Sequence, residues 1–507
     1  MAALEEPLVV NAVYPDCAGC KCSHLSKKGA GPPTRQLISL GLIVLCNALP
    51  ISSLYPFLYF MVRDFHVAKS EQDIGYFAGV IGSSFMIGRF FTGIYWGVLA
   101  DKYGRKPVIF AGVLSVIVFN TFFGLSSGFW MAVVTRFLLG SFNGMLGTVK
   151  AYASEICSEE HQALGVSVVS TTWAFGLIIG PALGGYLSQP AKKYPNIFKS
   201  TLFDRFPYLL PCLCITIFAI LALAITFDLP ETLHNHEPSH EGCFNDNGSK
   251  VKSQNGDATA SAAESGLATA EDPKMPSPKY EAPKTKSLWK NQALLGSTAV
   301  YCIWSMHDIA YTEIFSLWAL SPTSLGGLNF RSSDVGNVFA ISGFSMLVFQ
   351  LGLFPHLANL LGPVIVTRVS AALSIPLMAA YSYISMLRHT WLWVAILSAS
   401  VLKNILSVST TTGSFLLINN SVRQDQRGSA NGLAMSIVSL FKAIGPAGGG
   451  SLFAWSQTRT QASFLPGDQL VFFCINIVTI LTVLATFEPF LPQSTNKPIP
   501  EEAFVTH

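Results

Sequence analysis

The chain has 507 residues, of which 50% are hydrophobic and only 12% are charged, and its net charge is +3 at pH 7. A soluble globular protein carries about a quarter charged residues, so the composition argues against one. The small and scattered positive charge gives no electrostatic footprint for nucleic acid. The sequence contains no nucleotide-binding loop, nucleophile triad or redox motif, which argues against an enzyme and gives no reason to expect a cofactor.

Long apolar segments recur along the whole chain. A helix needs about 20 residues to cross a membrane core about 30 Å thick, and inside lipid every backbone group must be bonded within the chain. The sequence therefore predicts an all-α membrane protein whose twelve transmembrane helices form two pseudo-symmetric six-helix bundles. The predicted helices cover residues 37–62, 74–100, 107–126, 129–151, 162–188, 207–228, 291–318, 334–358, 363–386, 391–418, 429–455 and 469–488.

One long hydrophilic segment separates the sixth predicted helix from the seventh. It is too poor in apolar residues to fold alone, which predicts a disordered linker. Both termini then lie on one side, and placing that side in the cytoplasm puts most Lys and Arg there, as the positive-inside rule requires. The expected units are a cytoplasmic N-terminal tail (1–36), a first bundle (37–231), a cytoplasmic linker (232–288), a second bundle (289–490) and a cytoplasmic C-terminal tail (491–507).

The two halves of the sequence are related to each other. Residues 180–185 (GPALGG) recur as residues 445–450 (GPAGGG), and residues 73–75 (DIG) recur as residues 334–336 (DVG). Each match is short, but both lie at an offset of about 260 residues. Internal duplication of this kind is typical of secondary transporters, in which two bundles rock about a central site.

The loop after the second predicted helix, residues 97–106 (GVLADKYGRK), resembles the loop signature of the major facilitator superfamily. Gly97 is expected to permit close helix contact, Gly104 a tight turn, and Asp101 a cap on the next helix, while Arg105 begins a basic pair that holds the loop at the inner surface. The alternative is an ordinary positive-inside turn.

The matching stretch of the second half, residues 357–362, lacks both the acid and the basic pair. A conformational lock made by these charges is therefore expected in the first half only.

Two further glycine patterns resemble signatures of the same superfamily. The fourth predicted helix carries Arg136 followed by glycines at 140 and 144. The fifth resembles the signature of proton-coupled antiporters, although Ser167 stands where that pattern has an earlier glycine. Glycine at these spacings lets helices approach and slide, and plain helix packing is the alternative. The conformational residues expected from these patterns and their repeat are Gly180, Pro181, Gly184, Gly445 and Pro446.

A further set of segments resembles one plant family within this superfamily. The segments that carry it are residues 17–20 (CAGC), 50–54 (PISSL), 150–155 (KAYASE), 231–236 (ETLHNH) and 426–428 (QRG). Together they resemble the zinc-induced-facilitator-like transporters over nearly the whole chain outside the linker.

This resemblance implies a proton-coupled antiporter of zinc and iron homeostasis, driven by a proton gradient and without a cofactor. Its cargo would be a small carboxylate-rich metal chelator, nicotianamine or a mugineic-acid phytosiderophore, moved out of the cytosol either free or metal-bound. The implied protein is a monomer in the lipid bilayer of the plasma membrane or the vacuole.

Two buried cations stand at equivalent places in the two halves. A charge at the centre of a membrane costs about 2.5–3.5 kcal/mol unless it faces protein or water. Aligning the fourth helix with the tenth sets Arg136 opposite Lys403, and one cation in each bundle would suit a substrate with several carboxylates. Alternatively, each neutralises a local carbonyl or helix end. The other expected substrate-binding residues are Asn143, Asn404, Tyr55, Tyr59, Trp304 and Tyr311.

The seventh predicted helix contains titratable groups that are candidates for proton coupling. His307 and Asp308 share a helical face with Trp304 and Tyr311, and either could exchange a proton against substrate. A structural hydrogen bond between His307 and Asp308 is the alternative. Glu313 lies on a different face of the helix and nearer the outer end, so we rank it below this pair as a candidate for proton coupling.

Arg89 and Lys442 share a helical face with glycines of their own helices, so we expect both at helix interfaces. Each has either a conformational role or a structural pairing partner. Outside the helices, the spacing of Cys17, Cys20 and Cys22 and of His234 and His236 is that of metal ligands. Either these segments sense a metal, or they are disordered and hold no fixed site.

Two rival functions stay open at this stage. One is a proton-coupled antiporter of another cargo, such as potassium, auxin or a xenobiotic. The other is a membrane metal sensor that does not transport.

Overall fold

The computed structural model describes residues 33–157, 162–233, 288–422, 427–459 and 462–496. Residues 1–32 and 497–507 of the predicted tails and 234–287 of the predicted linker therefore lie outside the described residues, together with Cys17, Cys20, Cys22, His234 and His236.

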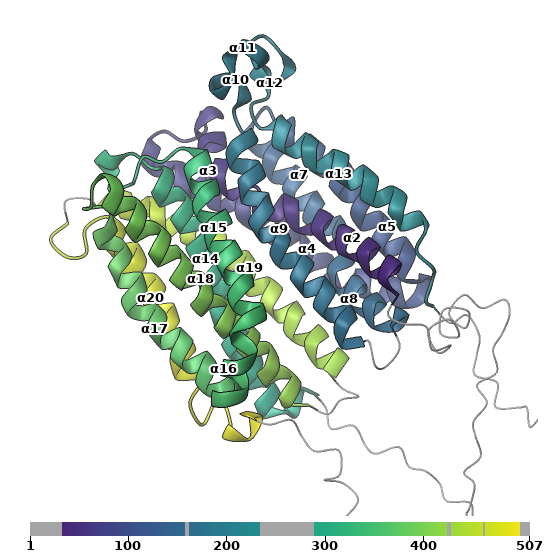
Figure 1. Ribbon diagram of the computed structural model, residues 1–507. Helices are drawn as coiled ribbons and strands as arrows, with labels where there is room; N and C mark the ends of the chain where they lie inside the picture. Colours follow the sequence, from purple (N-terminus) through teal and green to yellow (C-terminus); the bar gives the residue numbers. More distant parts are fainter. Residues whose placement is uncertain (1–32, 158–161, 234–287, 423–426, 460–461, 497–507) are drawn as a thin grey trace, which may run out of the picture.

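Six membrane-length spans make up the first half of the chain, and Figure 1 shows their arrangement. The first span is interrupted at residues 53–54 and the fourth at residues 143–144, whereas the third contains one π-helical turn. Three helices of four residues each follow the fifth span. The helices are α2 (Thr34–Ser52), α3 (Tyr55–Asp64), α4 (Ile74–Tyr103), α5 (Arg105–Ser115), α6 (Thr121–Gly124), α7 (Phe129–Phe142), α8 (Met145–Ile156), α9 (Gln162–Leu187), α10 (Pro190–Lys193), α11 (Pro195–Phe198), α12 (Leu202–Arg205) and α13 (Leu209–Phe227).

The second half repeats the arrangement with six more spans. A short helix after the eighth span takes the place of the signature loop of the first half. The helices are α14 (Gln292–Leu320), α15 (Ser332–Gly352), α16 (Phe354–Leu361), α17 (Pro363–Ile384), α18 (His389–Asn420), α19 (Arg427–Gln457) and α20 (Asp468–Ala485).

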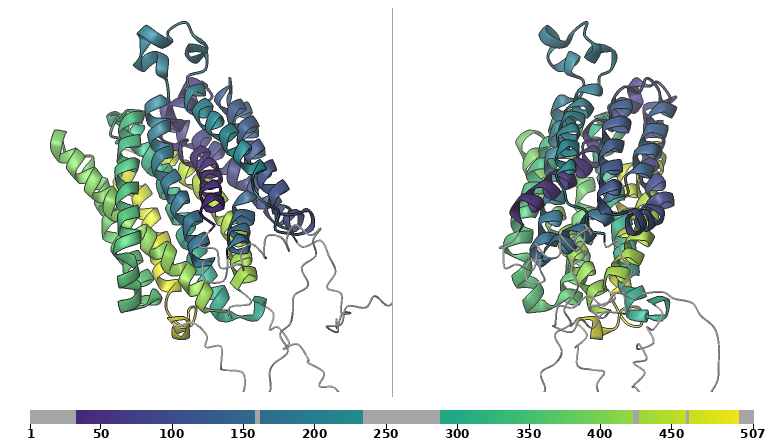
Figure 2. Two further views of the ribbon diagram at one scale, coloured as in Figure 1. Left: turned by 45° about the vertical axis from the view of Figure 1, so that its right-hand side comes forward. Right: turned by 90° about the vertical axis from the view of Figure 1, so that its right-hand side faces the viewer.

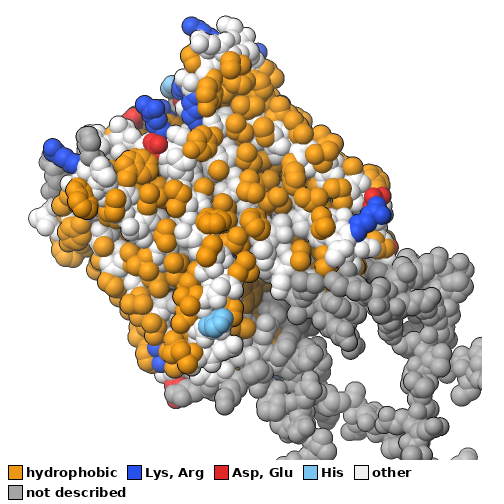
Figure 3. All heavy atoms as spheres, viewed as in Figure 1, with side chains coloured by type: hydrophobic (Ala, Val, Ile, Leu, Met, Phe, Trp, Pro, Cys, Tyr) orange, Lys and Arg blue, Asp and Glu red, His pale blue; other side chains and the backbone are white. Residues whose placement is uncertain are grey.

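Eleven of these spans are long and apolar enough to cross a membrane, and the exception is α14. Hydrophobic side chains cover the broad side of the bundle, with charged side chains near its ends (Figure 3). The predicted twelve-helix, all-α fold is therefore confirmed. The span that falls short is the one that carries His307, Asp308 and Glu313, because ionisable residues lower its apolarity.

The bundle has two different ends. α2 begins, α13 ends, α14 begins and α20 ends at one of them, which we call the terminal face; α10, α11 and α12 stand on the other, which we call the opposite face (Figures 1 and 2).

The duplicated segments of the sequence meet crosswise between the halves. α4 packs along α19, and α9 along α15. A methyl group at Gly75 would lie 2.6 Å from the carbonyl oxygen of Gly450, and one at Gly336 would lie 2.8 Å from that of Pro181. Each DxG segment thus lies against the Gly-Pro segment of the other half, at a distance that only glycine permits.

The interface between the halves is closed at the opposite face. One hydrophobic core there contains residues of both halves, among them Phe57 and Ile81 of the first and Phe315 and Trp318 of the second. Toward the terminal face the cores separate, one drawn almost entirely from the first half and one from the second. The conformation is therefore sealed at the opposite face.

Hydrogen bonds reinforce this seal. Ser188 at the end of α9 bonds to Ser332 at the start of α15, with 3.0 Å between the hydroxyl oxygens. The ammonium group of Lys193 donates to Ser332 as well, at 3.0 Å, and to the carbonyl oxygen of Gly185 at 2.5 Å. The two halves are thus joined by polar contacts outside the shared core.

Candidate functional site

A buried ion pair connects α14 to α18. The Lys403 ammonium donates to Oδ1 of Asp308 at 2.6 Å, and the Ser407 hydroxyl donates to the same oxygen at 2.5 Å. Lys403 is only 3% exposed, and its ammonium also lies 4.0 Å from the centre of the Tyr311 ring. The Asp308 side chain keeps 39% of its accessible surface. The charge of Lys403 is therefore already balanced, but by a carboxylate that solvent can reach.

His307 has different partners from Asp308. Its ring stacks on Trp304 with 4.6 Å between centroids, and its Nδ1 lies 3.0 Å from the hydroxyl of Thr479 on α20. Nε2 has no hydrogen-bond partner within the described part of the chain. The expected structural alternative, a His307–Asp308 hydrogen bond, is not what the structure shows, because Asp308 accepts from α18 instead.

Arg136 on α7 is the buried cation of the first half. It is 2% exposed, its Nη1 donates to the carbonyl oxygen of Pro50 at 2.9 Å, and its guanidinium lies 5.3 Å from the ring centres of Phe85 and Phe123. This is the local carbonyl contact that the sequence left open as an alternative to substrate binding. Nε has no partner among the residues that the structure describes.

Glu313 is the most unusual group in the interface. It is 0% exposed, and no donor among the described residues reaches either carboxyl oxygen. Its neighbour in the other half is Gly82, where a methyl group would lie 3.1 Å from Oε2, and Arg136 is the cation within electrostatic range. An ionised carboxylate without a donor is strongly disfavoured in such a place.

From the sequence, Glu313 ranked below His307 and Asp308 as a candidate for proton coupling. The signal that could have ranked it higher is that it is the third ionisable group of a single membrane span. Helical periodicity could not show that the face on which it stands lies against the other half.

Tyr55 connects these groups. It is partly buried on α3, near Phe339 of the second half, and lies within electrostatic range of Arg136, Asp308 and Glu313. The structure thus gathers residues of α3, α7 and α14 around one region of the interface, next to the Lys403 pair.

The other residues predicted to bind substrate lie at several depths. Asn143 stands at the break between α7 and α8, is 1% exposed, and has no partner for either amide atom in the described chain. The Tyr311 hydroxyl donates to that of Tyr381 at 2.8 Å. Tyr59 and Trp304 are buried, and Asn404 is partly buried. Binding by these residues stays a prediction.

The signature loop differs from its expected geometry in two respects. Asp101 does not cap the next helix: it lies inside α4 and pairs with Arg105 at 2.5 Å. Glu231 supplies the cap instead, accepting the backbone N–H groups of Arg105 at 2.9 Å and Lys106 at 3.0 Å. The reason is that Gly104, with φ of +106°, occupies the capping position and has no side chain. Gly104 thus makes the expected turn.

Gly97 also behaves differently from the expectation. A methyl group there would meet no atom of the described residues within 4 Å, so the predicted close helix contact is not found among them. The charges of the loop stay within the first half, where Arg105 also binds Glu155 at 3.1 Å.

The glycines of the two Gly-Pro segments lie in close contacts. Gly180 and Gly184 of α9 pack on Ser52 and Ser53 at the break of the first span, and Gly445 of α19 packs on Ile309 of α14. The Gly-Pro segment of α9 therefore makes two kinds of contact. Its glycines pack on the broken first span, and Pro181 contacts α15 of the other half. A conformational role for these residues stays a prediction.

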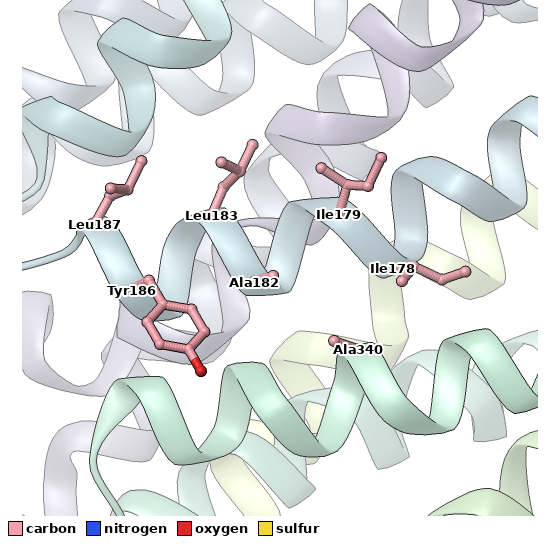
Figure 4. A pocket seen from close by; sticks show the side chains of 7 residues that line it. All are labelled: Ile178, Ile179, Ala182, Leu183, Tyr186, Leu187 and Ala340. Carbon is pink, nitrogen blue, oxygen red and sulfur yellow. The ribbon is translucent and has the colours of Figure 1, made fainter.

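An apolar pocket lies elsewhere along the interface. It measures about 310 Å³ and is formed by α9 side chains and Ala340 of α15 (Figure 4). The Tyr186 hydroxyl at its edge bonds to Asn337 at 2.5 Å. With no charged group in its lining, the pocket does not have the chemistry of a site for an ionic cargo. Its lining residues are Ile178, Ile179, Ala182, Leu183, Tyr186, Leu187 and Ala340.

Among the described residues no group of three His, Cys, Asp or Glu side chains could hold a metal ion. The predicted Cys and His metal ligands cannot be placed, since they lie outside these residues.

Comparison with known proteins agrees with this geometry. Residues 40–446 match the family model of the Major Facilitator Superfamily. The chain is 51% identical over 494 residues to the zinc-induced-facilitator-like protein 1 of Arabidopsis thaliana, covering 96% of this chain and 98% of that protein. It is 49% identical over 495 residues to the zinc-induced facilitator 1 of the same plant, covering 97% and 99%.

The crystal structure of a D-xylose–proton symporter has the same fold, with a TM-score of 0.66 and 12% identity over 92% of this chain and 99% of that chain. Since a family model spans most of the sequence and two relatives span nearly all of it, the chain belongs to the major facilitator superfamily of membrane carriers and, within it, to the zinc-induced-facilitator-like proteins.

Proposed function

We propose that the protein is a proton-coupled antiporter that moves a small carboxylate-rich metal chelator, nicotianamine or a mugineic-acid phytosiderophore, out of the cytosol. The observation that carries the coupling is the pair of carboxyl groups on α14. Asp308 is ion-paired with Lys403 and reachable by solvent, whereas Glu313 is sealed between the halves without a donor. One helix thus presents an ionised and a protonated carboxyl group at the interface that must open and close during transport.

Glu313 is the group best placed to carry the exchanged proton. When the opposite face opens, the contact with Gly82 parts and water reaches the carboxyl group, which can then exchange its proton. A carboxylate binds either a proton or an ammonium group of a zwitterionic cargo, but not both. Competition for one carboxylate moves the two species in opposite directions, which is antiport. The present conformation, closed at the opposite face with Glu313 protonated, corresponds to the proton-loaded form. For antiport, a further movement must then expose Glu313 toward the terminal face, where the proton leaves and the ammonium group of the cargo takes its place.

His307 and Asp308 remain the other proposed coupling groups. Asp308 can remain ion-paired with Lys403 or leave it unpaired. If Asp308 takes up a proton, Lys403 is free to bind a carboxylate of the cargo. This would place Lys403 in the binding site, as the sequence predicted.

The direction of transport follows from the proposed topology. With the terminal face in the cytoplasm, the interface is closed to the outside or to the vacuolar lumen, and the cargo enters from the cytosol. The plasma membrane and the vacuolar membrane both present an acidic compartment opposite the cytosol, so the same exchange would work in either.

The test is flux in proteoliposomes. Vesicles with an acidic lumen should accumulate labelled nicotianamine or mugineic acid several-fold over vesicles without a gradient, and collapse of the gradient by an ionophore should abolish the difference. Equal uptake with and without the gradient would overturn proton coupling.

A cargo panel separates the rivals. Gradient-driven flux of potassium, auxin or a xenobiotic, but of neither chelator, would keep the carrier and replace the cargo. Absence of flux for the whole panel, with zinc binding to the purified chain, would favour the metal sensor.

A further inference from the structure

Arg89 and Lys442 are cations near the middle of long helices, and neither forms an ion pair within the described residues. Arg89 stands near the middle of α4, which has 30 residues, and Lys442 near the middle of α19, which has 31. At 1.5 Å per residue each is about 20 Å from either end of its helix. Ionisable groups at that depth are costly and rare, and they face protein or water. Both side chains are partly buried rather than sealed.

The fold brings these two residues toward each other. α4 and α19 are the helices that pack along one another across the two halves, and Lys442 lies within electrostatic range of Arg89. Lys150 of α8 lies within range of both. Its ammonium sits 5.5 Å from the centre of the Phe415 ring on α18. Arg89, Lys150 and Lys442, which we call the cation triad, therefore join helices of both halves.

The triad has no carboxylate bound to it in the part of the chain that the structure describes. None of its members takes part in an ion pair anywhere in the described ranges. Asp308 is within electrostatic range of Lys442, but its Oδ1 is already bound by Lys403 and Ser407. Tyr301, the other group within range of Arg89, is neutral as a phenol. Three like charges close together repel each other, and a bound anion would relieve this repulsion.

The cations that the sequence predicted as a carboxylate clamp are in the opposite situation. Lys403 is neutralised by Asp308, and Arg136 is held by the Pro50 carbonyl between two aromatic rings. Both are sealed from solvent in this conformation. The triad, in contrast, is partly accessible and lies on the side where the cores of the two halves are separate.

We propose that Arg89, Lys150 and Lys442 form the entry site for the carboxylate groups of the cargo, reached from the terminal face. This rests on the proposed function in that the cargo is a polycarboxylate. Three cations suit a tricarboxylate such as nicotianamine, with charge-assisted hydrogen bonds to each group.

The position of the triad also gives the cargo a mechanical effect. While the site is empty, Arg89 and Lys150 of the first half repel Lys442 of the second, which opposes a closer approach of the halves on the side of the terminal face. A bound polyanion removes this repulsion and bridges the halves. Binding therefore favours closure at the terminal face, the step that must precede release on the other side.

The test measures binding rather than transport, so that it does not depend on the proton gradient. Purified protein in detergent is titrated with nicotianamine and, separately, with citrate as a simple tricarboxylate. Arg89→Gln and Lys442→Gln should each raise the Kd at least about tenfold, and added salt should weaken binding to the wild type. Arg89→Lys should keep most of the affinity. Lys192→Gln, an exposed lysine of the opposite face, is the matched control and should bind like the wild type.

Thermal unfolding without ligand tests separately whether these cations are unbalanced. Removing an unbalanced cation should leave the melting temperature of Arg89→Gln and Lys442→Gln equal to or above that of the wild type. A fall would mean that these residues make structural pairs, and would overturn the proposal.

The outcomes also separate the site from the cargo. Unchanged affinity for nicotianamine in the Arg89→Gln/Lys442→Gln double variant would overturn the site while leaving the proposed function intact. Triad-dependent binding of citrate without binding of nicotianamine would keep the anion site and overturn the proposed cargo. Binding of neither anion by the wild type would overturn the site.

Discussion

The carboxyl group of Glu313 in the second half lies directly against Gly82 in the first, where a methyl group would be 3.1 Å from Oε2. We propose that this contact parts when the opposite face opens. The protonation of one carboxyl group would then be tied to the relative position of the two halves, which is what coupled transport requires.

Glu313→Gln tests that relationship. Glutamine has the shape of the protonated acid but cannot release a proton, so uptake of cargo should no longer respond to an imposed proton gradient, while the protein folds normally. Gradient-driven flux in proteoliposomes measures the effect, with Glu71→Gln, an exposed acid of the opposite face, as the control. Full gradient dependence in Glu313→Gln would assign the proton to another group.

Removing only the carboxylate of the Asp308–Lys403 pair should lower stability more than removing both charges. Asp308→Asn leaves a buried ammonium group without its counter-charge. Breaking a fully buried pair costs about 3–5 kcal/mol; because Asp308 is partly accessible, we expect a loss of about 1–3 kcal/mol in the free energy of unfolding. Asp308→Asn/Lys403→Met should regain that stability without regaining transport. Thermal melts beside flux assays check both, and a stable, fully active double variant would show that the pair is structural.

Close packing at Gly79 should be indispensable for the seal. A methyl group there would lie 2.5 Å from the carbonyl oxygen of Pro446, whereas at Gly93 on the same helix it would meet no atom of the described residues within 4 Å. Gly79→Ala should therefore lower stability by about 1–3 kcal/mol and reduce flux strongly, and Gly93→Ala should be close to neutral. Equal behaviour of the two variants would contradict the packing described between α4 and α19.

A disulfide across the seal should arrest transport. The hydroxyl groups of Ser188 and Ser332 are hydrogen-bonded across the halves, which brings cysteines at these positions within reach of each other. Oxidised Ser188→Cys/Ser332→Cys should lose most of its flux and recover it on reduction, while each single variant should be unaffected by the oxidant. Normal flux in the crosslinked protein would mean that the opposite face need not open.

Alkaline pH should strengthen the same seal. Burial lowers the pKa of Lys193 to about 8, against an opposing effect of Asp334, whereas an exposed lysine titrates near pH 10.4. The closed form thus binds fewer protons than the open form between about pH 8 and pH 10. Closure is favoured as the pH rises through that window.

The measurement for this prediction is the distance between spin labels at Ile197 and Asn329 on the opposite face. The closed population should grow with pH in the wild type and stay constant in Lys193→Met. The same pH response in both proteins would rule out Lys193 as its source.

Much of the fold was readable from the sequence. Apolar length predicted the spans, and the repeated segments at 180–185 and 445–450 predicted two related halves, because both signals depend only on residues close together in the chain. Helical periodicity also placed Trp304 and His307 on one face, where their rings do stack.

Only the tertiary structure decided which groups satisfy one another. Asp308 pairs with a lysine of α18 and not with its neighbour His307, Glu231 caps the helix that Asp101 was expected to cap, and Glu313 faces Gly82 of the other half. The physical reason is that periodicity fixes the direction in which a side chain points from its own helix. The partner that it meets depends on the positions of helices hundreds of residues apart, which packing of the whole bundle determines.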